Sequence, residues 1–154
     1  MTQDAYRAQV DARAKQIIDY KAEQGGRGLW DAHVLLAKDQ HHDHIVDIVK
    51  NGLNLRTDGP NGRPTGGPFQ IFPCMALACR WPDKMPDDAM AIIKEFMTEG
   101  ALERGNTENH WLMYYVGNLL AAEMWPDLDR TWNGLPPDAM RAEAMRWILG
   151  MINR

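Results

Sequence analysis

Proline-marked turns divide the second half of this 154-residue chain into segments of helix length, and this punctuation most constrains its fold. Trp81-Pro82-Asp83 and Trp125-Pro126-Asp127 each end an apolar run, whereas Pro86-Asp87-Asp88 and Pro136-Pro137-Asp138 each begin one. Proline suits the first turn of a helix, and acidic residues there meet the positive end of the helix dipole. No segment alternates apolar and polar residues with period two. The pattern therefore predicts an all-α protein built from helical hairpins, without a sheet.

Apolar spacing near 3.6 residues and terminating glycines or prolines delimit the individual helices. We expect helices over residues 4–24, 29–38, 41–50, 70–81, 86–98, 108–124 and 136–152, in a single domain that covers residues 1–154. Asn51-Gly52 should end the third helix, and Pro73 should lie in the first turn of the fourth. Between them, residues 53–68 carry dense turn chemistry that leaves no room for regular structure.

Composition narrows the class of partner. The formal charge of -4 argues against nucleic acid or an anionic membrane as the main partner, since either demands a basic face. No long uncharged apolar stretch or signal-peptide core appears, which predicts a soluble chain, cytoplasmic as given and secreted or periplasmic if it is a fragment. Cys74 and Cys79 are predicted to be reduced core residues. No cofactor is expected.

The densest chemistry lies at the start of the helix predicted over 108–124, where an acid, an amide and an imidazole follow one another. His110, Tyr114 and Asn118 are spaced four apart, so they share one stripe of that helix. Gly117 is small enough to permit close approach by a neighbouring helix, as are the alanines after it. We therefore expect a helix inside the protein whose polar N-terminal end opens on a cleft.

Gly105-Asn106-Thr107-Glu108-Asn109-His110-Trp111, with the helix that follows and ends in Trp125-Pro126, resembles the (α/α) toroid proteins that include alginate, heparin and related polysaccharide lyases. The resemblance covers roughly residues 70–154. It implies that the helical hairpins form part of an (α/α) toroid, with Asn109 and His110 at the lip of a substrate cleft. The implied ligand is a uronic-acid polysaccharide or oligosaccharide, and the implied reaction is β-elimination.

In that reaction the enzyme must neutralise the carboxylate beside a weakly acidic proton and stabilise the charge that builds on it. The resemblance assigns this role to the Asn109 amide and makes His110 the base or a second neutralising group. In the family a Tyr commonly acts as acid or base and an Arg helps to bind substrate. Tyr114 lies on the motif helix itself and cannot be equated with that Tyr, although it is retained as a candidate catalytic residue.

A complete toroid also needs more helices than the seven predicted here. The chain is accordingly interpreted as a fragment, as one whose cleft is completed by another copy or another polypeptide, or as a degenerate binding form. An incomplete toroid should expose apolar surface, which predicts self-association or instability.

Several side chains have competing interpretations. Glu108 is either a glycosidase acid, which would need a second carboxylate, or a complement to the helix dipole. His110 is either part of the site or a core histidine, and Tyr114 and Asn118 are either site residues or structural hydrogen-bonding groups. The alternative to an enzyme is a non-catalytic helical module that binds sugar or protein.

Other candidates lie outside the motif. Trp30, beside His33, and Trp111 are candidates for stacking on sugar rings, and Arg56 and Arg63 in the turn-rich segment are candidates for binding uronate carboxylates. The remaining histidines are clustered at His41, His42 and His44. They are interpreted as a polar helix start, with a divalent metal site as the less favoured alternative.

Overall fold

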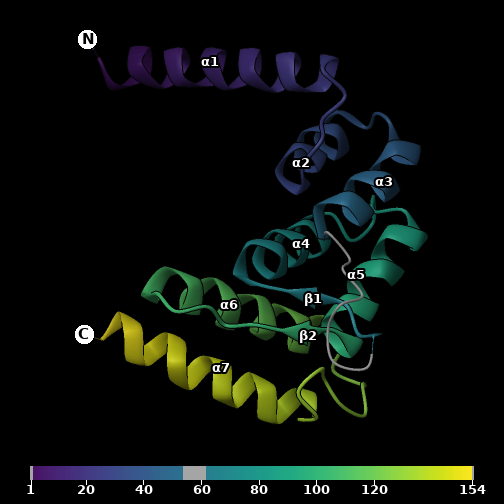
Figure 1. Cartoon of the computed structure of the whole chain (residues 1–154). Helices are drawn as coiled ribbons and strands as arrows, with labels where there is room; N and C mark the ends of the chain where they lie inside the picture. The colour runs from purple at the N-terminus through teal and green to yellow at the C-terminus, as the bar shows by residue number, and fades with distance from the viewer. Residues whose placement is uncertain (1, 54–61, 154) are drawn as a thin grey trace.

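The computed structural model describes residues 2–53 and 62–153, which form seven helices and one minimal pair of strands (Figure 1). In chain order these are α1 (Gln3–Glu23), α2 (Leu29–Lys38), α3 (His42–Leu53), β1 (Thr65–Gly66), α4 (Pro68–Arg80), α5 (Asp87–Glu99), β2 (Ala101–Leu102), α6 (Glu108–Met124) and α7 (Pro137–Ile152). The all-α prediction is confirmed. None of the helices in the described ranges has the length and apolar character that crossing a membrane requires.

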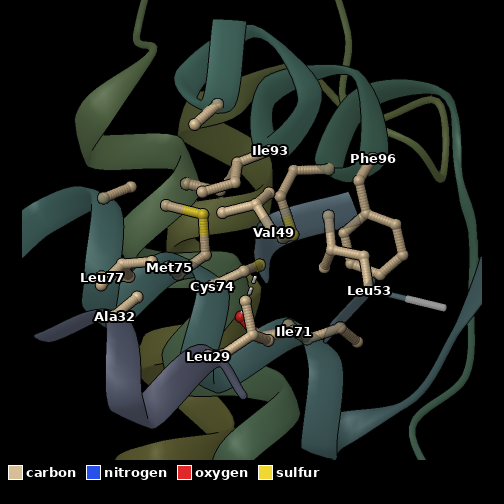
Figure 2. Packing of buried hydrophobic residues seen from close by; sticks show 14 of the residues in the cluster. Leu29, Ala32, Val49, Leu53, Ile71, Cys74, Met75, Leu77, Ile93 and Phe96 are labelled. Carbon is tan, nitrogen blue, oxygen red and sulfur yellow. Dashed lines mark hydrogen bonds between the residues drawn. The ribbon is translucent and has the colours of Figure 1, made fainter. Parts of the chain in front are cut away.

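The helices follow one another as a stack, with α1 and α7 at its two ends (Figure 1). Helix α4 lies in the middle and contacts α2, α3, α5 and α6. Its side chains Ile71, Met75 and Leu77 are fully buried, and Figure 2 shows them among residues of the neighbouring helices. Gly117 of α6 permits the close approach that the sequence predicts, because a Cβ atom there would lie 2.4 Å from Cγ2 of Ile71.

Helix α3 differs from its predicted bounds at its C-terminal end. The prediction that Asn51 and Gly52 terminate it is wrong, because both lie inside a helix that continues to Leu53. The reason is tertiary packing. Leu53 is fully buried, and Gly52 lies so close to Leu29 that a Cβ would be 2.6 Å from Leu29 Cγ. Burial of Leu53 outweighs the weak helix propensity of the two residues before it.

Helix α4 begins earlier than predicted, so Pro73 lies inside it rather than in its first turn. The helix starts at Pro68, and the Gln70 side chain accepts a hydrogen bond from the backbone N–H of Gly67 at 3.0 Å. Pro73 has no N–H to donate to the carbonyl one turn earlier, yet it is buried in the core. Apolar packing of this central helix therefore overrides the usual position of proline.

The prediction that there is no sheet is wrong, because the structure contains one pair of short parallel strands. Thr65 pairs with Ala101 and Gly66 with Leu102 as two-residue parallel strands. Strands this short have no periodicity for a sequence to reveal. Gly66 is required there because a Cβ would lie 2.3 Å from Cζ of Phe96.

The two Trp-Pro-Asp turns have similar backbone conformations. Trp81 caps α4 with φ −130° and ψ 45°, and Trp125 caps α6 with φ −128° and ψ 64°. Each donates its backbone N–H to the carbonyl four residues earlier. Pro86 and Pro136 then occupy the N-caps of α5 and α7. The repeated sequence thus marks a repeated turn between consecutive helices.

Candidate functional site

The N-terminal end of α6 is held in a defined shape by its own residues. Thr107 is the N-cap, and its Oγ1 accepts a hydrogen bond from the backbone N–H of His110 at 3.3 Å. Trp111 Nε1 donates to the carbonyl of Gly105 at 3.2 Å. Gly105 has φ +75°, and a Cβ there would lie 2.8 Å from His110 Nδ1. The turn therefore requires glycine and fixes the side chains that follow it.

The three residues with polar chemistry lie at the surface end of this helix. Glu108 and Asn109 are exposed, and His110 is partly buried. The His110 ring meets Phe69, from the first turn of α4, edge to face with centroids 5.1 Å apart. Asn109 is thus open to solvent, and the His110 ring packs at the start of α4; the cleft predicted at this end of the helix stays a prediction.

Phe69 belongs to a series of aromatic side chains that crosses three helices. Trp30 of α2 contacts Phe72 of α4 at 5.9 Å between centroids, and Phe72 is one helical turn from Phe69. Trp30 is 55% exposed and Phe69 is 63% exposed. We name Trp30, Phe72, Phe69 and His110 the aromatic row. It joins two residues predicted to serve the site, Trp30 and His110, through two phenylalanines that the sequence did not single out.

The His33 ring packs against Trp30. The two rings are stacked with centroids 5.6 Å apart, and His33 Nδ1 accepts a hydrogen bond from Trp81 Nε1 at 2.9 Å. This bond places the proton of the neutral ring on Nε2, which is buried and has no hydrogen-bond partner among the described residues. Burial, together with the positive charge of Arg80, lowers the pKa of His33 below its usual value. Its environment therefore disfavours the protonated form of the ring.

Trp111 lies on another side of α6, facing α7. Its ring meets Trp147 at 5.8 Å, and the Arg104 guanidinium lies over it at 4.1 Å. A hollow of about 300 Å³ here is lined by Glu108, Trp111, Arg146, Trp147, Gly150 and Met151. Glu108 is the single carboxylate among these lining residues. The second carboxylate that a glycosidase needs is not part of this hollow.

Tyr114 and Asn118 share the stripe of His110 but are buried beneath the surface. Asn118 donates to the carbonyl of Tyr114 at 2.9 Å and accepts from Trp132 Nε1 at 3.0 Å. The Tyr114 ring packs against Tyr115 and Trp132. Burial, with the nearby Tyr115, raises the pKa of Tyr114. Both residues therefore make their contacts within the core of the protein.

The two arginines predicted to bind carboxylates have different outcomes. Arg56 lies outside the described residues. Arg63 donates to the backbone carbonyls of Glu99 at 2.6 Å, Gly100 at 2.7 Å and Trp132 at 3.0 Å. Its guanidinium therefore ties the C-terminal end of α5 to the segment before α7. It also lines a polar depression of about 740 Å³ that includes Arg130 and Trp132.

The histidine cluster before and within α3 makes one local contact and one contact with the segment before α2. His42 Nε2 lies 3.1 Å from Asp39 Oδ1, and His44 Nε2 lies 3.4 Å from the carbonyl of Gly26. Within residues 2–53 and 62–153, no three His, Cys, Asp or Glu side chains form a group that could hold a metal ion.

Cys74 and Cys79 are free, as predicted. The Cys74 thiol donates to the carbonyl of Ile71 at 3.2 Å, and burial raises its pKa (Figure 2). Cys74 is therefore an unreactive core residue.

Comparison with known proteins adds no relative to this description: no protein-family model, curated protein or solved structure matches the chain.

Proposed function

We propose that this protein binds an extended acidic polysaccharide or oligosaccharide along the aromatic row, with Asn109 and His110 at one end of the binding surface. The observation that carries the proposal is the exposure of Trp30 and Phe69, two large aromatic side chains that face solvent on neighbouring helices. Pyranose rings present C–H groups on their faces, and such groups pack well on aromatic rings while the hydroxyls stay hydrated.

The length of the row favours a chain of sugars over a single one. It runs from α2 across α4 to α6, and ring contacts join Trp30 to Phe72 and Phe69 to His110. Asn109 is exposed beside it and offers an amide donor to a carboxylate or hydroxyl. The N-terminal end of α6 adds partial positive charge, which favours a uronate over a neutral sugar.

Binding is proposed without catalysis by this chain alone. Asn109 and His110 could neutralise a uronate carboxylate and take a proton, as the resemblance to the toroid lyases implies. The tyrosine of that chemistry is not supplied by α6, because Tyr114 and Tyr115 are buried and pack against each other. Elimination would therefore require a tyrosine from outside α6.

Calorimetric titration with oligosaccharides of alginate, heparin and hyaluronan, and with dextran as a neutral comparison, tests the proposal. Trp30→Ala and Phe69→Ala should each weaken binding about tenfold, because each removes one apolar stacking surface. Leu149→Ala and Ile152→Ala, which remove exposed apolar side chains from α7, serve as matched controls and should leave the affinity unchanged. Absence of binding to all the acidic sugars, or equal losses in the control variants, would refute the proposal.

The same samples report on chemistry. An unsaturated sugar product absorbs in the ultraviolet, so rising absorbance during incubation would show elimination. New reducing ends without that absorbance would show hydrolysis instead. Binding with neither signal is the expected result for the chain by itself.

A further inference from the structure

Helix α1 is exposed along almost its whole length. Every described residue from Thr2 to Ile17 is exposed, and Ala22 is the one buried residue of the helix. Its C-terminal end is held to α2 by ion pairs from Lys38 to Asp19 and from Lys21 to Asp31. Figure 1 shows the rest of α1 projecting from one end of the stack. Most of the stability of helices in proteins comes from tertiary packing rather than from helix propensity, so α1 gains stability if something packs along it.

The apolar residues of α1 form a seam. Tyr6, Val10, Ile17 and Tyr20 are 47% to 61% exposed, and together with Arg13 they are spaced alternately by four and three residues. This is the a/d spacing by which two helices pack against each other in a coiled coil. Arg13 occupies the middle of the seam, where its aliphatic stem can pack while its charge stays at the edge.

The chain exposes more surface than a compact monomer of its mass. The chain exposes 9450 Å² at a mass of 17.5 kDa. A compact monomer of that mass exposes about 7,900 Å². The excess exceeds the roughly 800 Å² that each partner buries in a standard interface.

The charges of α1 favour a second copy in antiparallel orientation. Its first half carries two aspartates and one arginine, whereas its second half carries three basic and two acidic residues. Antiparallel pairing therefore sets a net negative half against a net positive half, and it places the two helical stacks at opposite ends of the pair. We propose that α1 is a self-association helix that pairs with α1 of another copy. This inference does not depend on sugar binding.

Sedimentation equilibrium of the full chain tests the pairing. The wild type should be a dimer at micromolar concentration, and the double variant Val10→Asp/Ile17→Asp should raise the dissociation constant at least about a hundredfold. Arg13→Leu should lower it, because the seam then becomes continuous. All three positions are exposed, so the near-ultraviolet circular dichroism of the core should stay unchanged in every variant.

The matched control lies at the other end of the stack. Leu149→Asp/Ile152→Asp introduces the same charges on exposed apolar positions of α7 and should leave the dimer intact. A wild type that stays monomeric throughout would overturn the inference. A dimer abolished by the α7 variant but not by the α1 variant would also overturn it.

Discussion

The contact between α6 and α4 depends on Gly117, and Gly117→Ala tests how rigid it is. A Cβ there would lie 2.4 Å from Cγ2 of Ile71 and 3.4 Å from the backbone of the same residue. Ile71 is fully buried in the core, so a shift of its side chain would disturb the residues packed around it. Overpacking of this kind costs about 1–3 kcal/mol, whereas replacing glycine by alanine inside a helix gains about 0.5–1 kcal/mol. We expect a net loss of about 1–2 kcal/mol, and a larger loss for Gly117→Val.

Gly150→Ala is the matched control, because Gly150 lies in α7 and a Cβ added there would meet no other atom within 4 Å. It should be neutral or stabilise the protein by up to about 1 kcal/mol. Urea unfolding followed by tryptophan fluorescence measures both, and a net loss of about 1–2 kcal/mol corresponds to a midpoint shift of roughly half a molar to one molar. If Gly117→Ala stabilises the protein as much as Gly150→Ala does, α6 and α4 are not packed as described.

Three further predictions concern buried polar groups. Because the pKa of His33 is lowered in the folded protein, the unfolded chain binds more protons as the pH falls through the usual value of 6.5. The free energy of unfolding should therefore fall from about pH 7 to about pH 5. His33→Asn should reduce that fall, measured by urea unfolding at the two pH values. Asn118→Leu leaves Trp132 Nε1 without its acceptor and should cost about 1–3 kcal/mol of unfolding free energy, with an indole signal that shifts in the proton NMR spectrum. Arg63→Lys cannot reproduce the three carbonyl bonds and should cost about 1.5–3 kcal/mol, measured by thermal unfolding; an unchanged melting temperature would contradict the role described for Arg63.

Helix positions are predictable wherever local chemistry decides them. Glu108–Met124 and Leu29–Lys38 form with their predicted bounds, since a cap or a turn residue stands next to each. The predictions for Pro73 and Gly52 are wrong because their positions depend on burial of the helices that carry them, which no local signal reports. The paired strands escape prediction because two residues are too few to show a period.

The candidate site is predictable in part for a related reason. The N-cap at Thr107 fixes the start of the helix and so places Asn109 in its first turn, and the structure leaves that residue exposed. The sequence does not identify Phe69 and Phe72 as site residues, because aromatic residues within an apolar run indicate a buried core. The arrangement of α2, α4 and α6 instead leaves Phe69 exposed and Phe72 partly exposed. The spacing of four residues correctly places Tyr114 and His110 on the same stripe of α6. It does not reveal that Tyr114 is buried whereas His110 is only partly buried.

The most direct test of the proposed function is an NMR titration with an acidic oligosaccharide, since each of the six tryptophans contributes one indole N–H signal. We expect the indole signal of Trp30 and the side-chain amide signal of Asn109 to shift together and saturably with alginate oligosaccharide. The indole signals of Trp111 and Trp147, on the α7 side of α6, should stay in place. Shifts confined to Trp111 and Trp147, or no shift at Trp30, would contradict binding along the aromatic row.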